Sequence, residues 1–409
     1  MKLFILLLFS VAVGAQEQYL TKTFREDIRS LEVKVAGEVI SNPVIELNGE
    51  AKIEISFDAL YQTGRQFTYS VYHCDADGKR SALLPIEYMN GFQGSFITDY
   101  VNSIATTVGY TNYKLFLPND DMQFLVSGNY VAVVCEDNAP DKPVLTACFS
   151  VVEPLVEIES SVLGNTDIDF NKSHQQLEFV VNQKNINIAF PQTELKIFVC
   201  QNNNHYDVRT DLQPTMFRGK QLIYNHNRNL IFDAGNEYRR IEFQTHRYNG
   251  MGVDKIGYYE PYYHVTLFLD ERRNRKAYSY DQDQNGRFFV RCSGCESPDN
   301  EADYYVVHFS LSSDRLAAGD VYLFGDMFGN ITDERSKMEY NAETGAYEKA
   351  VLLKNGQYNY QYVFVGEGDT KPSLSLTEGN FFETENEYLI KVFYRPPGAR
   401  FDRLIGALH

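Results

Sequence analysis

Hydrophobic and polar residues alternate along most of this chain, with apolar side chains at every second position. This period of two is typical of half-buried β-strands, because successive side chains of a strand point to opposite faces of the sheet. The pattern recurs throughout the sequence, at 53–57, 67–71, 113–117, 145–151, 177–181, 195–199, 265–269, 305–309, 321–323, 358–364 and 388–394. Few windows show a helical period. The pattern predicts an all-β chain of immunoglobulin-like β-sandwich domains in series.

Proline and polar stretches divide the series of strands into three blocks. Pro154 follows a strand-like run that ends at Val152, and proline fits a turn between blocks better than the middle of a sheet. A second polar stretch, 293–300, contains Pro298. We therefore expect a signal peptide at 1–15, an N-terminal β-sandwich at 16–154, a middle β domain at 155–300 and a C-terminal β-sandwich at 301–409.

The first residues have the features of an export signal. Lys2 precedes an apolar run from Leu3 to Val13, and small residues follow as far as Ala15. The run is about half of the roughly 20 residues that a membrane-spanning helix needs. We expect cleavage between Ala15 and Gln16 and export of a mature chain. Because no cysteine follows this site, we expect no lipid anchor there.

Composition narrows the possible partners. The chain has 28 Phe, 29 Tyr and no Trp, and its formal net charge is −17. Aromatic enrichment of this kind favours packed β structure over disorder. A nucleic-acid-binding protein needs a concentrated basic face, so the acidic balance argues against nucleic acid as a partner.

Searches for catalytic motifs find no nucleophile elbow, no P-loop, no H-E-x-x-H and no complete dinucleotide fingerprint, and the eight histidines lack ligand spacing. The segment 281–286 begins like a calcium-binding loop. Its twelfth position is Cys292, however, where such a loop needs a carboxylate. Asn285-Gly286 instead indicates a hairpin turn. We expect no enzymatic activity, no metal and no cofactor.

The six cysteines allow two interpretations in an exported protein. Cys74, Cys135, Cys148 and Cys200 lie mostly in strand-like runs, where a small buried side chain is typical, although disulfide pairing is open to them. Cys292 and Cys295 form a C-x-x-C loop with no second ligand pair for zinc. This loop predicts a local disulfide or two free thiols.

Two groups of residues are candidates for contact with a partner protein. One is a tyrosine cluster and the other is a set of basic pairs: Tyr258, Tyr259, Tyr262 and Tyr263, and Arg239, Arg240, Arg272 and Arg273. The basic residues make the middle block nearly neutral between two acidic ones, which would suit an acidic partner. The alternative interpretation is that the tyrosines pack across strands and the arginines are solvated.

Several motifs, taken in order, resemble a known family. They are 72–77 (YHCDAD), 85–92 (PIEYMNGF), 127–130 (SGNY), 201–203 (QNN), 232–239 (FDAGNEYR), 283–286 (DQNG), 321–325 (VYLFG), 353–360 (LKNGQYNY), 383–386 (ETEN) and 402–406 (DRLIG). Together they resemble the plug protein of the type IX secretion system of Bacteroidota, over almost the whole mature chain.

This resemblance implies a periplasmic plug subunit without catalysis. Such a subunit reversibly closes the periplasmic side of the giant outer-membrane β-barrel translocon, at the inner face of the outer membrane, and does not itself span the membrane. Residues 302–365 also look like early-set immunoglobulin-like modules that bind starch or glycogen. The alternative function is therefore a periplasmic or surface carbohydrate-binding β-sandwich protein; a hydrolase with carboxylates distant in sequence is a further alternative.

Overall fold

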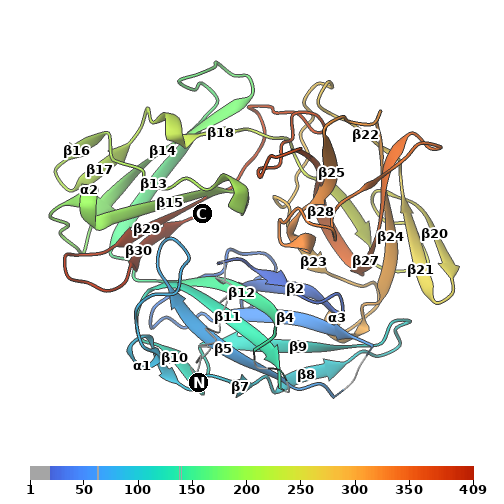
Figure 1. Cartoon of the computed structure of the whole chain (residues 1–409), viewed down its shortest axis with the longest axis horizontal. Coiled ribbons are helices and arrows are strands. Elements are labelled where there is room, and N and C mark those ends of the chain that lie inside the picture. The colour runs from blue at the N-terminus through green and yellow to red at the C-terminus, as the bar shows by residue number, and fades with distance from the viewer. Residues whose placement is uncertain (1–18, 62–63, 138, 140) are drawn as a thin grey trace, which may run out of the picture.

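Three β-sandwiches make up residues 19–61, 64–137, 139 and 141–409, the part of the chain that this computed structural model describes (Figure 1). The prediction of an all-β chain of sandwiches is confirmed. The α-helices are single turns, each with proline in its first turn: α1 (Pro85–Tyr88), α2 (Pro191–Glu194) and α3 (Pro298–Glu301). The predicted signal peptide, with Ala15 and Gln16, lies outside the described residues.

The first sandwich is built from residues 22–152. One sheet has the order β1 (Lys22–Thr23), β12 (Pro143–Val152), β11 (Gly128–Glu136), β5 (Phe67–Cys74) and β7 (Ser95–Phe96), with β3 (Val44–Glu46) parallel to β12. The other has β2 (Ile28–Val35), β4 (Ile53–Leu60), β9 (Tyr110–Leu117) and β8 (Asp99–Asn102); β6 (Met89–Gly91) pairs with β10 (Met122–Phe124). The alternation at 53–57 becomes a fully buried row of core residues, as predicted.

The second sandwich combines residues 156–233 with the last two strands of the chain. One sheet contains β13 (Val156–Leu163), β14 (His174–Gln183), β17 (Gln221–Tyr224), β16 (Met216–Arg218) and β18 (Ile231–Asp233). The other contains β15 (Leu195–Gln201), β29 (Tyr388–Tyr394) and β30 (Arg403–Leu408). Short 3-10 turns lie at η1 (His205–Asp207) and η2 (Arg228–Leu230).

The third sandwich occupies residues 239–366. One sheet contains β19 (Arg239–Phe243), β28 (Gly356–Gly366), β23 (Phe288–Val290) and β25 (Gly319–Phe324). The other contains β20 (Val253–Tyr259), β21 (Tyr262–Leu267), β24 (Tyr304–Ser312), β27 (Ala346–Lys354), β26 (Glu339–Asn341) and β22 (Asp270–Glu271). The turn η3 (Asp326–Phe328) follows β25.

Strand pairing contradicts the predicted division at residue 300. β15 of the middle block pairs with β29, and β19 and β21 pair with β28 and β24 of the last block. The third sandwich is thus inserted between strands of the second. Alternation marks where strands lie but carries no information about their partners, and the break in the pattern at 293–300 lies between strands of one sandwich.

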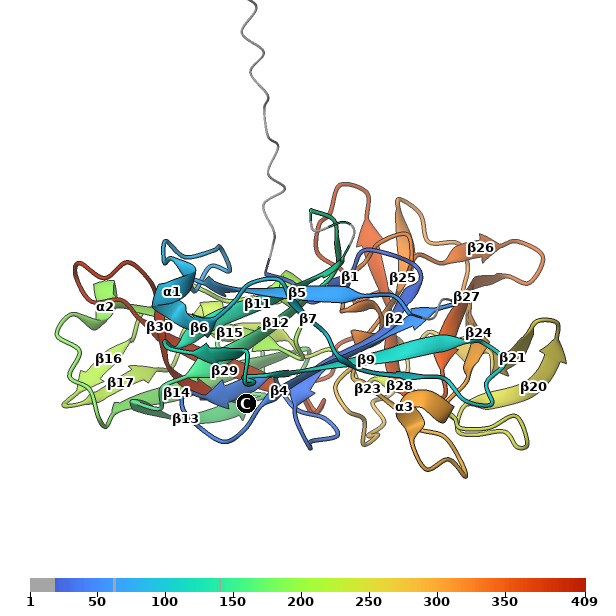
Figure 2. The same ribbon diagram turned by 90° about the horizontal axis from the view of Figure 1, so that it is seen from below.

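The three sandwiches meet around a common centre. Figure 1 shows the first sandwich below, the second at upper left and the third at upper right, and Figure 2 shows the second and third at the left and right with strands of the first in front of them. Within the described ranges no helix is long and apolar enough to cross a membrane.

Candidate functional site

The predicted tyrosine cluster forms the β20–β21 hairpin at the edge of the third sandwich. Tyr258 and Tyr259 are 55% and 59% exposed. They are neighbours on one strand, so their rings point to opposite faces rather than forming the flat pair that would stack on a sugar. The exposed rings are available to a protein partner.

The other two tyrosines of this cluster pack inward. Tyr263 stacks on His246 with 4.6 Å between ring centres and lies 5.1 Å from Tyr305. The hydroxyl of Tyr262 is 3.2 Å from the hydroxyl of Tyr61 in the first sandwich. One side of the hairpin is therefore part of an interface between sandwiches.

Two of the predicted contact arginines form ion pairs with a buried carboxylate at the third sandwich. Arg239 and Arg273 both bind the carboxylate of Glu378, at 3.0 Å and 2.7 Å, and Glu378 is fully buried. Arg239 also pairs with Asp270 at 2.6 Å. Burial raises the pKa of Glu378, but the two guanidinium groups outweigh it, so the pKa lies below its ordinary value. Charge reversal at either arginine would break this buried cluster.

The other two predicted arginines are nearer the surface. Arg240 pairs with Asp281, and Arg272 is half-buried. Arg239 and Arg273 come together on Glu378, Arg240 pairs separately with Asp281, and the tyrosine hairpin lies on the other sheet of the same sandwich. Of the predicted contact residues, Tyr258 and Tyr259 have the most exposed side chains.

Besides the tyrosine hairpin of the third sandwich, the first sandwich has an exposed apolar surface that the sequence analysis does not predict. Ile86 and Phe92 are each 80% exposed, and Leu84 and Leu125 are also exposed. They lie close together because the amide of Leu125 donates to the carbonyl of Tyr88 at 2.9 Å. The sequence does contain a signal for this surface. Pro85 and Gly91 interrupt an apolar segment, so the segment as a whole cannot form one buried strand.

Buried polar contacts join the first sandwich to the third. The Lys354 ammonium lies 2.7 Å from the carboxylate of Asp58, and both side chains are essentially inaccessible to solvent. The hydroxyl of Tyr304 donates to the same carboxylate at 2.7 Å. Asp303 accepts from the amide and the hydroxyl of Thr107 at 2.9 and 2.7 Å. Such contacts fix one orientation, since an unpaired buried charge is costly.

The second sandwich is attached to both of the others. The amide of Ala76 donates to Asp402 and the amide of Asp402 donates to Asp75, each at 2.9 Å, which joins it to the first. Arg287 of the third sandwich binds Glu387 at 2.5 Å and the side-chain oxygen of Asn42 at 3.0 Å. Asn42 belongs to the first sandwich and Glu387 precedes β29, so this contact joins all three.

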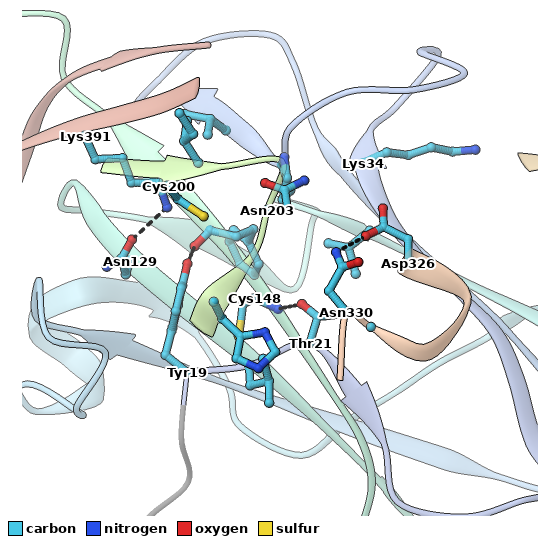
Figure 3. Close-up of a pocket in the computed structure, with 18 of the residues that line it drawn as sticks. Tyr19, Thr21, Lys34, Asn129, Cys148, Cys200, Asn203, Asp326, Asn330 and Lys391 are labelled. Atoms are coloured by element: carbon cyan, nitrogen blue, oxygen red, sulfur yellow. Dashed lines mark hydrogen bonds between the residues drawn. The ribbon is translucent and has the colours of Figure 1, made fainter. Parts of the chain in front are cut away.

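A cavity of about 420 Å³ lies where the sandwiches meet (Figure 3). The first sandwich contributes Tyr19 and Phe149, and the second contributes Lys391 of β29. Burial lowers the pKa of the Lys391 ammonium to about 8. Burial also lowers the pKa of His205, another wall residue, to about 4, so its imidazole is neutral at pH 7.

The remaining sequence motifs have structural positions. Asn285 and Gly286 both have positive φ, at 52° and 88°, and form the predicted turn, but the flanking segments are not paired as a hairpin. In the described part of the chain no group of three or more histidine, cysteine or acidic side chains could hold a metal. Cys292 and Cys295 form a local disulfide, while Cys74, Cys135, Cys148 and Cys200 are buried.

Comparison with known proteins gives two matches. The family model for the first domain of the type 9 secretion system plug protein matches residues 28–153, which correspond to the first sandwich. A crystal structure of a hypothetical protein from Parabacteroides merdae is 56% identical in sequence, with a TM-score of 0.94; the match covers 96% of this chain and 99% of that one. No curated protein matches.

Proposed function

The chain belongs to the type IX secretion system plug protein family, and from this we propose that it is a periplasmic subunit that closes the periplasmic side of the outer-membrane barrel translocon. The closing mechanism is steric and requires no catalysis: a folded block occupies or caps the opening, and engaged substrate displaces it.

The observation that best supports this mechanism is the way the sandwiches are joined. Serial domains on flexible linkers would deform under a crossing chain, whereas here each pair of sandwiches shares buried polar contacts. One group of residues, Arg287, Glu387 and Asn42, connects all three. A block held in one orientation can obstruct a wide opening.

A reversible plug also needs an exposed contact surface that is not fully apolar. We assign that role to two regions, the hairpin carrying Tyr258 and Tyr259 and the surface formed by Ile86 and Phe92, all of them more than half exposed. Exposed aromatic and aliphatic side chains with a polar surround are typical of such interfaces.

Co-purification tests the proposal. Tagged wild-type chain is isolated from detergent-solubilised outer membranes, and we expect recovery of a very large β-barrel protein. Replacing Ile86 and Phe92 by serine should reduce that recovery. Replacing Ile168 and Phe170, which are 53% and 66% exposed on the second sandwich, by serine serves as the matched control. Failure of the wild-type chain to recover any barrel would contradict the proposal, and retention on glucan alone would favour the carbohydrate-binding alternative.

A further inference from the structure

The charged side chains around the central cavity differ in their partners. Most have one of their own: Lys34 binds Glu32 at 2.9 Å, Asp77 binds Lys79 at 2.9 Å, Arg287 binds Glu387 at 2.5 Å, and Asp326 accepts from Asn330 at 2.5 Å. Lys391 has no carboxylate partner among the residues that the structure describes. Its ammonium donates to the hydroxyl of Ser150 at 2.8 Å and the side-chain oxygen of Asn129 at 3.4 Å.

A lysine ammonium has three N–H donors, and these two neutral oxygens engage two of them. The rings of Phe198 and Tyr19 lie 5.5 and 5.8 Å from the nitrogen and add only weak cation–π attraction. Lys391 itself is 7% exposed. Burying a cation without a counterion is expensive, and such a charge is usually paired. A donor therefore remains for an anion that enters the cavity.

The rest of the cavity wall is mainly apolar. Val33 and Phe149 of the first sandwich, Phe198 and Leu389 of the second, and Phe288 of the third line it. Among the polar groups of the wall, the side-chain oxygen of Asn330, a residue that is 3% exposed, accepts no hydrogen bond from the protein. The volume of the cavity, about 420 Å³, falls within the range of about 300–1,000 Å³ that is usual for small-molecule sites.

We propose that this cavity binds a small amphiphilic anion, with its carboxylate or phosphate head on the Lys391 ammonium and its apolar body among Phe149, Phe198 and Phe288. Figure 3 shows Lys391 beside Asn129 of the first sandwich and Cys200 of the second. Because all three sandwiches contribute to the wall, the ligand would contact each of them. This binding does not depend on the proposed plug function, since it requires only the isolated chain.

Calorimetric titration of the mature wild-type chain with four ten-carbon probes tests the proposal. Decanoate and decyl phosphate carry the two anionic heads, whereas 1-decanol and decyltrimethylammonium keep the chain without the anion. We expect saturable binding of at least one anionic probe with one site per chain, and the tighter of the two identifies the head group. A neutral or cationic probe that binds as tightly, or no binding of either anion, would overturn the proposal.

Lys391→Met removes the ammonium while keeping an unbranched side chain. We expect roughly a 10- to 100-fold loss of affinity for the anionic probe, the range of a charge-assisted hydrogen bond. Lys255→Met, on an exposed position of β20, is the matched control and should bind as wild type does. Unchanged affinity in Lys391→Met would contradict the assignment of the head group. The four-probe titration of the wild-type chain tests the site even if this variant folds poorly.

Discussion

Two buried lysines at two interfaces between sandwiches differ in one respect. Lys354, between the first and third sandwiches, is paired with the carboxylate of Asp58 at 2.7 Å. Lys391, between the first and second, donates to the neutral oxygens of Ser150 and Asn129 and has no carboxylate partner in the described part of the chain. The same side chain is thus neutralised as a structural contact in one place and left uncompensated beside a cavity in the other. This contrast separates a contact that holds the block together from a group positioned for a ligand.

The largest expected effect is at Lys354. Lys354→Met should lower the free energy of unfolding by about 3–5 kcal/mol, because it leaves the Asp58 carboxylate buried without a counterion. Urea unfolding followed by circular dichroism measures the change. The double variant Lys354→Met with Asp58→Asn removes both charges and should recover part of the loss. A loss below about 1 kcal/mol in the single variant would contradict a structural role for the pair.

Lys391→Met should act in the opposite direction. Burial lowers the pKa of Lys391 to about 8 from its ordinary 10.5, so keeping the ammonium charged inside the fold costs about 3 kcal/mol at pH 7. Ser150 and Asn129 keep their own hydrogen bond of 2.9 Å after the substitution. We expect a rise of up to about 3 kcal/mol in the free energy of unfolding, measured as above. A loss as large as that of Lys354→Met would remove the distinction between the two lysines.

The pH dependence of stability should distinguish them too. Since the pKa of Lys391 is lower in the folded chain, the unfolded chain binds more protons between about pH 8 and 10.5. The contribution of Lys391 to stability therefore rises with pH across that window. The advantage of Lys391→Met over wild type should shrink by about 1 kcal/mol per pH unit above pH 8. Taking the difference between the two chains cancels the tyrosine and cysteine titrations that they share, and a constant difference would contradict the lowered pKa.

The smallest effect is expected at Ser150. Ser150→Ala removes an acceptor of the Lys391 ammonium and should cost about 1 kcal/mol in the wild-type chain. In the Lys391→Met background the cost should be smaller, because only the bonds of Ser150 to Asn129 and Tyr19 remain to be lost. A double-mutant cycle from urea unfolding measures the coupling. Equal costs in both backgrounds would show that the ammonium gains nothing from the hydroxyl.

The sequence predicted strands more reliably than their partners. The row Ile53, Ile55 and Phe57 became a buried strand because a period of two directly encodes which face is covered. The pairing of β15 with β29 joins residues almost two hundred positions apart and leaves no local signal. Because that signal is absent, the sequence does not reveal that the third sandwich is inserted into the second, and the predicted boundary at 300 is wrong.

The sequence locates candidate contact residues but does not show their surroundings, for the same reason. Tyrosines 258 and 259 were found from local composition and are exposed. The sequence does not reveal that Arg239 pairs with a buried carboxylate, because its partner Glu378 lies 139 positions away. The alternation of Ile390 and Val392 would place Lys391 on a solvent-facing side, yet that side of β29 packs on the first sandwich. Strand periodicity does not show contacts between distant segments, and these contacts determine the surroundings of Arg239 and of Lys391.

In the proposed function, this three-sandwich block closes the translocon. The most direct measurement is the ionic conductance of the purified translocon in a planar bilayer, before and after the mature chain is added to the periplasmic side. We expect the conductance to fall in a saturable manner and to recover when the chain is washed out. A conductance that does not change at saturating protein would contradict the claim.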